Sequence, residues 1–362
     1  MSKPLPSATL RANQNRAIPT TPSSTPGIIL GDNVVWNPSI LPNGHVVLIG
    51  ASGSGKTQTL KALAYELPKL FPEINIIFID FQGDLDLPGE VYYPLDMESP
   101  HGINPLTIDL DTKGGGPNLQ AIAVATIFKK ALTMGTNQEG LVLDILNSCY
   151  MERGINQDDP QTWQLEPPTF TDMQREIENR IEDGCKESQK LSLKLATTFQ
   201  YGIFSRPQPP LNAPIMRFDL SALGKVPGLA AIATESLIKQ IMDSHRLMGE
   251  ISNKIPRTFL CIDEVKEVKT SRTLKIILSE GRKFGLCAIL ASQRDAEISD
   301  EAIANSSSKI VLSVDQTEVS RVAKRFRFAE SLVSQLQPLE ALVRMGSEGH
   351  KCRIKPFYER LT

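Results

Sequence analysis

The sequence predicts an α/β fold with a central, mostly parallel β-sheet and an inserted all-helical subdomain. Continuous apolar runs occur at 45–50, 75–81, 258–265, 286–293 and 309–314. Runs of this length, separated by helical patterns, are typical of parallel strands that are buried on both faces. Helical spacing of apolar residues across 118–152 and 171–200, between the second and third runs, predicts the insertion.

The composition indicates a globular protein without a membrane-inserted segment. The chain has 362 residues, of which 41% are hydrophobic, and no apolar stretch is long enough to span a bilayer. Its five cysteines are scattered without metal-ligand spacing, so we expect reduced thiols and a cytoplasmic location. The net charge of −2 gives no overall basic field, but binding of nucleic acid needs only a locally basic surface.

Composition and breaks in the pattern divide the chain into four parts. Residues 1–26 are rich in Pro, Ser and Thr, and we expect a disordered leader. A Gly-rich break at 111–117 and a Pro-rich stretch at 206–214 flank the helical patterns. The expected division is the leader at 1–26, the first part of the sheet domain at 27–111, the helical insertion at 112–213 and the second part of the sheet domain at 214–362.

A phosphate-binding loop follows the first long apolar run. The sequence GASGSGKT matches G-x-x-x-x-G-K-[ST], in which glycines let backbone N–H groups point at phosphate oxygens. Lys56 is placed to reach the β- and γ-phosphates, and the Thr57 hydroxyl is placed to ligate Mg²⁺. The candidate nucleotide-binding residues are Gly50, Ser52, Gly53, Ser54, Gly55, Lys56, Thr57 and Gln58. The motif predicts binding of a nucleoside triphosphate, ATP or GTP, with Mg²⁺.

An acidic pair ends the third apolar run. Asp263 is placed to hold Mg²⁺ through a water molecule, and Glu264 to polarise the attacking water as a base. Asp80 ends the second run, where support of Mg²⁺ and capping of the following turn are alternative roles. Carboxyl ends of parallel strands share one edge, so these groups are expected to converge with the phosphate-binding loop.

Three further residues are candidates for the hydrolytic step. Gln293 ends a strand that we place between the strands of the phosphate-binding loop and the acidic pair, where an amide would touch the γ-phosphate or orient water. Arg282 precedes that strand and is a candidate arginine finger that acts on a neighbouring subunit, with Arg294 as the competing candidate.

The candidate basic residues for nucleic-acid contacts form a less specific pattern than the motifs described above. Lys266, Lys269 and Arg272 follow the acidic pair, and the densest basic run is 321–327. Contacts to phosphates need only positive groups of this kind, but solvated helix faces carry the same residues.

Together these motifs resemble the HerA–FtsK superfamily of RecA-like ATPases. The similarity covers roughly residues 28–360 and rests on GASGSGKT, IDFQGD, INPL, CIDE, SEGRKFG and ASQ. The resemblance implies a RecA-like P-loop fold, ATP hydrolysis with Lys56, Glu264 and Gln293 as catalytic residues, and Arg282 as the finger acting in trans. It also implies a homo-hexameric ring that moves double-stranded DNA. We expect neither the upstream β-barrel of HerA nor the winged helix and membrane helices of FtsK.

Two alternatives to a DNA motor remain open from the sequence. One is a secretion-type ATPase that acts on protein cargo. The other is a nucleotide-gated assembly subunit of a defence or mobile-element complex, which would work with a partner effector or nuclease protein.

Overall fold

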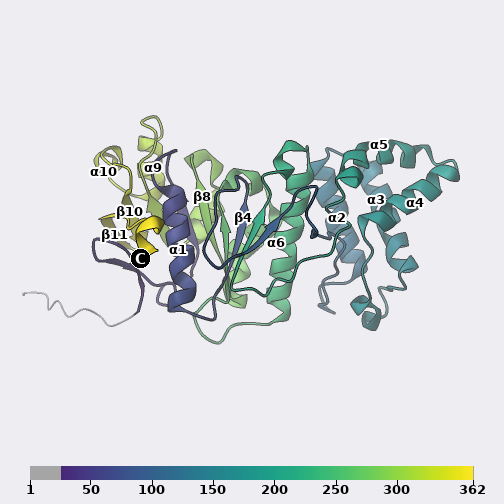
Figure 1. Ribbon diagram of the computed structural model, residues 1–362, viewed down its shortest axis with the longest axis horizontal. Helices are drawn as coiled ribbons and strands as arrows, with labels where there is room; N and C mark the ends of the chain where they lie inside the picture. Colours follow the sequence, from purple (N-terminus) through teal and green to yellow (C-terminus); the bar gives the residue numbers. More distant parts are fainter. Residues whose placement is uncertain (1–25, 362) are drawn as a thin grey trace, which may run out of the picture.

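The computed structural model describes residues 26–361 (Figure 1). The predicted leader, 1–26, therefore lies outside the described residues except for Pro26. No helix within 26–361 has the length and apolar character needed to cross a membrane.

A nine-stranded sheet forms the centre of the described chain, in the order β11-β10-β9-β3-β8-β7-β4-β6-β5. The seven strands from β9 to β5 are mutually parallel, whereas β10 and β11 are antiparallel additions at one side. The bounds of the strands are β3 (Val46–Ile49), β4 (Asn75–Asp80), β5 (Val91–Pro94), β6 (Ile215–Asp219), β7 (Thr258–Ile262), β8 (Leu286–Ser292), β9 (Ser308–Val311), β10 (Glu340–Met345) and β11 (Glu348–Arg353). The predicted mostly parallel sheet is confirmed.

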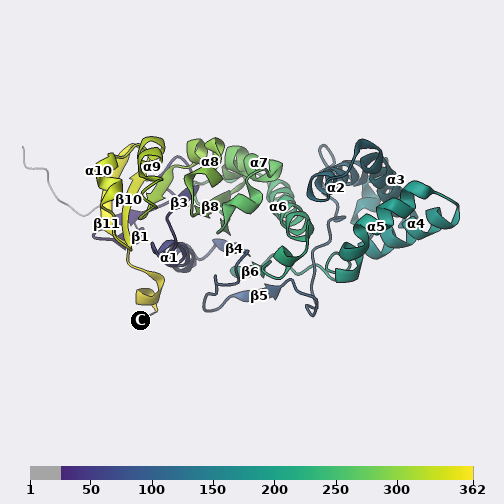
Figure 2. The same ribbon diagram turned by 90° about the horizontal axis from the view of Figure 1, so that it is seen from above.

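Helices cover both faces of this sheet (Figure 2). Helix α1 (Lys56–Leu70) lies on one face, and α6 (Leu229–Leu247), α7 (Arg272–Glu280) and α8 (Asp300–Asn305) lie on the other. In β3, Val46 and Leu48 pack in the core with α1, whereas Val47 and Ile49 pack in the core with α6 and α7. Both faces of the strand are therefore buried, which explains why it reads as a continuous apolar run.

A separate β-hairpin opens the described chain. Strands β1 (Ile28–Gly31) and β2 (Val34–Trp36) are antiparallel. Asp32 and Asn33 adopt φ angles of 46° and 67°, the left-handed conformation that tight hairpin turns require. Gly31 belongs to the strand, and a Cβ there would lie 1.7 Å from the carbonyl oxygen of Arg353. The glycine thus allows the hairpin to pack against the end of β11.

An inserted all-helical subdomain extends from one side of the sheet (Figure 1), which confirms this part of the predicted fold. Its helices are α2 (Pro117–Ala131), α3 (Thr136–Glu152), α4 (Phe170–Glu182) and α5 (Lys186–Tyr201). The Phe170 ring packs against Phe128, Phe199 and Phe204 at its centre. The exact domain boundaries stay predictions.

The INPL turn joins this subdomain to the sheet domain. The Asn104 side chain donates to the carbonyl oxygen of Pro168 and accepts from the N–H of Leu106. Its backbone carbonyl accepts from the Gln240 side chain of α6, 2.6 Å away. The turn, whose chemistry the sequence left unassigned, is therefore a structural joint.

Two short helices follow β9. Helices α9 (Val319–Phe326) and α10 (Glu330–Ser334) lead to β10, and helix does not continue to Leu339. Pro338 lacks an N–H and restricts the residue before it, which prevents helical continuation. Short 3-10 helices complete the chain: η1 (Pro160–Gln164), η2 (Leu223–Lys225), η3 (Val265–Val268), η4 (Gly281–Phe284), η5 (Asp295–Glu297) and η6 (Phe357–Arg360).

The buried His45, just before β3, predicts a loss of stability in mild acid. Its Nδ1 accepts from the N–H of Ala288, and burial, followed by the charge of Arg282, lowers its pKa to about 4. Because this pKa is below that of the unfolded chain, the stabilisation exists above about pH 6.5 and is lost as the pH falls towards 4. Between pH 7 and 4.5, wild-type protein should lose about 2 kcal/mol more unfolding free energy than His45→Gln.

Denaturant titrations at the two pH values measure this difference. His350→Gln is the control, because His350 is 38% exposed on β11. Equal losses in wild type and His45→Gln would show that His45 does not carry the effect.

Candidate nucleotide-binding and hydrolysis site

The parallel sheet brings the predicted site residues to one edge. Strands β3, β8, β7 and β4 are consecutive neighbours, and all run in the same direction. Their carboxyl ends lead into Gly50, Gln293, Asp263–Glu264 and Phe81, respectively. The predicted place of the Gln293 strand, between those of the phosphate-binding loop and the acidic pair, is confirmed.

The first backbone N–H groups of the loop after β3 are hydrogen-bonded, whereas most of the later ones are not. The N–H of Gly50 donates to Ser292 and that of Ala51 to Ser313, both to carbonyl oxygens. Within the described chain, the next amides without an acceptor are those of Ser52, Gly53, Gly55, Lys56, Thr57 and Gln58. Free amides in a loop that opens a helix form a cradle for an anion.

Two glycines of this loop are required by close neighbours. A Cβ on Gly50 would lie 2.3 Å from Ser54 Oγ, and one on Gly55 would lie 2.5 Å from Leu339 Cδ2. Gly55 also has a φ of 98°, which side chains rarely adopt. The N–H of Leu339 donates to the carbonyl oxygen of Ser54 over 2.9 Å. Leu339, which the sequence analysis missed, therefore holds the loop from the C-terminal segment.

The side chains of Lys56, Thr57 and Gln58 differ in their surroundings. Lys56 is 8% exposed, and its amine has no hydrogen-bond or ion-pair partner in the described chain. Thr57 is half-buried at the start of α1. Gln58 Oε1 instead accepts from the N–H of Tyr358, 3.4 Å away. The loop therefore leaves the lysine available to phosphate, and turns Gln58 towards η6.

Three carboxylates gather next to the loop. One oxygen each of Asp80, Asp84 and Asp263 lie within 4.8 Å of one another. Asp263 is 2% exposed, and its Oδ1 has no hydrogen-bond partner among the described residues. Burial, then the charge of Asp80, raises the pKa of Asp263 to about 7. Close carboxylates with an unpartnered oxygen fit a divalent cation such as Mg²⁺. Asp84 was not recognised as a candidate from the sequence.

Asp80 caps the turn after β4, one of its two predicted roles. Its Oδ1 accepts from the N–H groups of Gln82 and Gly83, and its Oδ2 from that of Leu85. Arg217 Nη1 lies 3.3 Å from Oδ2. This fully buried carboxylate therefore fixes the turn that carries Gln82 and Asp84.

Glu264 is held by side chains from two other strand ends. Its Oε1 accepts from Gln82 Nε2 at 2.6 Å and from Gln293 Nε2 at 2.7 Å. Glu264 itself is 2% exposed. Gln293 thus contacts the candidate base Glu264, and Gln82, which was not predicted from the sequence, contacts it too.

Comparison with known proteins gives one matching family model and several similar structures. Residues 230–326 match the model of the type IV secretion-system coupling protein DNA-binding domain. This segment runs from α6 to α9 and contains Asp263, Glu264, Arg282 and Gln293. No curated protein matches the sequence.

Two solved structures illustrate the similarity. VirB4 of Thermoanaerobacter pseudethanolicus superposes with a TM-score of 0.77 at 18% identity, covering 91% of this chain and 96% of that one. The bacterial conjugative coupling protein TrwBdeltaN70 gives 0.55 at 15% identity, covering 86% and 85%. This chain therefore shares its α/β fold with these two proteins. The fold prediction is confirmed.

The two candidate fingers lie at opposite edges of the sheet. Arg282 lies in η4, before β8, and Arg294 follows β8 on the edge of the phosphate-binding loop. Strand β8 has 7 residues, and at about 3.3 Å per residue the edges are roughly 20 Å apart. Arg282 therefore cannot reach the loop of its own subunit, and its side chain is exposed at the other edge.

The densest basic run is largely occupied by ion pairs. Arg321 and Arg325 both pair with the buried Asp295, at 2.9 and 2.7 Å. Arg325 also pairs with Asp300, 2.6 Å away. These arginines fix α9 against η5, and phosphate contacts of this run stay a prediction.

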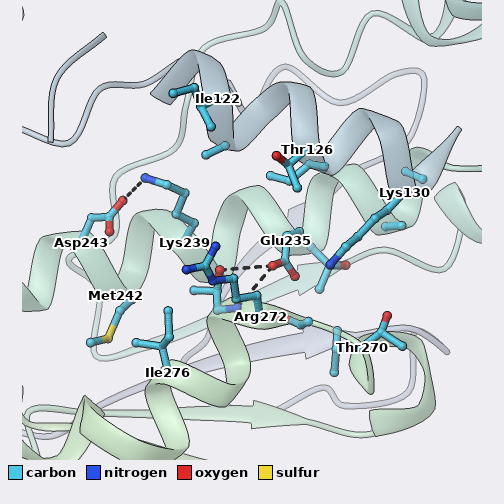
Figure 3. Close-up of a pocket in the computed structure, with 18 of the residues that line it drawn as sticks. Ile122, Thr126, Lys130, Glu235, Lys239, Met242, Asp243, Thr270, Arg272 and Ile276 are labelled. Atoms are coloured by element: carbon cyan, nitrogen blue, oxygen red, sulfur yellow. Dashed lines mark hydrogen bonds and ion pairs between the residues drawn. The ribbon is translucent and has the colours of Figure 1, made fainter. Parts of the chain in front are cut away.

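A cavity of about 350 Å³ lies between α2, α6 and the segment from η3 to α7 (Figure 3). Lys239 and Asp243 of α6 pair along one wall, and Glu235 accepts from Thr273 on another. Exposed Ile122 lies on the α2 side. The η3 segment that begins directly after Glu264 thus separates the hydrolysis site from this cavity.

The free amine of Lys56 predicts a simple binding test. Lys56→Ala should weaken ATP binding about a hundredfold or more, because a charge-assisted contact to phosphate is lost. Equilibrium titration with a non-hydrolysable ATP analogue and Mg²⁺ measures the loss. The control is Lys69→Ala in the same helix, where the lysine side chain is 50% exposed. Similar affinities for both variants would refute the assignment.

Proposed function

We propose that this chain is an ATP-hydrolysing, ring-forming motor of the HerA–FtsK type that acts on double-stranded DNA. The observation that carries this proposal is the convergence of Lys56, Asp263 and Glu264 at one sheet edge. The similar structure of TrwB in complex with ADP and Mg²⁺, with a TM-score of 0.57, supports nucleotide binding at the corresponding fold position. The matched coupling-protein DNA-binding model supports DNA as the cargo.

The residues of the site divide the hydrolytic work among them. The free loop amides and Lys56 bind the phosphates, while Thr57 and Asp263 would hold Mg²⁺. Mg²⁺, when bound, neutralises negative charge on the phosphates. Glu264 orients the attacking water and takes its proton, and Gln82 and Gln293 fix the orientation of its carboxylate.

We further propose that the active site is completed by a second copy of the chain. Arg282 lies exposed at the edge opposite the phosphate-binding loop, so only a neighbouring subunit can receive it. Subunits that place this edge against the next phosphate-binding edge form a closed ring, for which we propose a homo-hexamer.

Protein cargo is the second candidate. The secretion-system description of the matching family model favours it. Measurement of ATP hydrolysis with and without duplex DNA at low salt distinguishes the two. Absence of both DNA binding and stimulation would overturn the DNA motor and favour protein cargo. Electron microscopy with an ATP analogue and duplex DNA tests the ring and its stoichiometry.

Glu264→Gln should bind ATP but hydrolyse it about 10²–10⁴-fold more slowly, because the amide is no base. Bound ATP that stays intact after rapid gel filtration, quantified by chromatography, measures this trapping. A rate close to that of wild type would exclude Glu264 as the base.

Arg282→Ala should retain ATP affinity and lose about 10³–10⁵-fold in hydrolysis. Mixed with inactive Lys56→Ala subunits, it should recover part of the rate, since each intact phosphate-binding loop then receives Arg282 from a neighbour. The control mixture contains the double variant in place of Lys56→Ala and should stay inactive. Absence of recovery in the first mixture, or equal rates for monomeric and assembled wild type, would contradict the trans assignment.

A further inference from the structure

The two carboxylate oxygens of Glu264 lie in different surroundings. Gln82 and Gln293 both donate to Oε1, from the turn after β4 and from the end of β8. Two amide donors at 2.6 and 2.7 Å occupy the acceptor directions of this oxygen. Oε1 is therefore the anchored oxygen, and it is not available to a water molecule.

Oε2 is the oxygen that remains for water. It is buried, and it accepts no hydrogen bond from any residue in the described part of the chain. The ammonium of Lys266, from the η3 segment, lies 3.4 Å from it, close enough for an ion pair. A water molecule positioned by Oε2 must therefore compete with this lysine.

We propose that Lys266 forms an inhibitory ion pair with Glu264, and that the phosphodiester backbone of DNA relieves the inhibition by binding Lys266. The proposal rests on the hydrolytic function proposed above. Lys266 acts through Glu264, so it is a positioning residue with a negative effect on the rate. Gln82 is a positioning residue with the opposite effect.

The surroundings of Lys266 fit exchange between two anionic partners. Its side chain is 46% exposed, whereas Glu264 is 2% exposed, so an outside phosphate can reach the lysine but not the glutamate. The charge of Glu264, above all, raises the pKa of Lys266, which keeps the lysine charged. Arg272 on the same segment is exposed and has no ion-pair partner within the described residues, and it adds positive charge towards a polyanion.

The segment also supplies a route for mechanical coupling. It continues from η3 through Thr270 and Arg272, which line the cavity between α2 and α6 (Figure 3). DNA that draws Lys266 outwards therefore displaces a segment that adjoins Glu264 at one end and lines the cavity next to α2 at the other.

The test compares Lys266→Ala, Lys266→Arg and wild type in the presence and absence of duplex DNA. Without DNA, Lys266→Ala should raise kcat about fivefold with KM for ATP unchanged, because a half-exposed ion pair no longer competes for Oε2. Its stimulation by DNA should fall by a similar factor. Lys266→Arg, which keeps the cation, should retain low basal activity and DNA stimulation.

A matched control is available in α7. Lys275 pairs with Glu301 at the same 3.4 Å, and its side chain is 47% exposed, but the pair is remote from Glu264. Lys275→Ala should leave basal kcat and DNA stimulation unchanged. Gln82→Ala should lower kcat both with and without DNA, because Oε1 loses a donor. The opposite signs of the Lys266→Ala and Gln82→Ala effects on kcat distinguish the role of Oε2 from that of Oε1.

The outcomes separate failure of this inference from failure of the proposed function. If wild type hydrolyses ATP and responds to DNA but Lys266→Ala matches wild type, the inhibitory ion pair is refuted while the motor stands. If Lys266→Ala is faster but DNA leaves wild type unchanged, DNA is refuted as the relieving ligand. If wild type hydrolyses no ATP, the proposed function itself fails.

Discussion

The parallel hydrogen-bonded ladder β3-β8-β7-β4 is the constraint on which the site depends. It fixes the register of four strands whose carboxyl ends come from distant parts of the sequence. Because all four run the same way, the phosphate-binding loop, Gln293, the acidic pair and the Gln82 turn meet at one edge. Reversal of any one strand, which has 4 to 7 residues, would move its polar end by about 13–23 Å.

A buried ionic network then fixes the details of that edge. Arg217 pairs with Asp80 and Glu90, at 3.3 and 2.8 Å, and Asp80 in turn receives three backbone amides of the next turn. This network sets where Gln82 meets Glu264. The geometry of Glu264 thus depends on an arginine in β6.

Most of this arrangement can be predicted from local sequence motifs. The rest cannot, because it depends on contacts between residues that are far apart in the sequence. The phosphate-binding loop and Asp263–Glu264 are recognisable because each function is encoded within a few adjacent residues. Gln82, Asp84 and Leu339 are not, because their roles arise only when separate strand ends meet. Strand β5 is short and half exposed, so its residues lack the apolar run that revealed the others. Arg321 and Arg325 looked free in the sequence, since their partner Asp295 lies some thirty residues away.

The contact of Leu339 with the phosphate-binding loop also bears on how the protein is made. Synthesis proceeds from the N-terminus, so the phosphate-binding loop emerges from the ribosome well before Leu339, which packs on Gly55 and binds Ser54. Nucleotide is therefore expected to recognise a chain that includes Leu339 far better than one that stops before it. ATP would then stabilise chains that extend past Leu339, and shorter products would be degraded without this stabilisation.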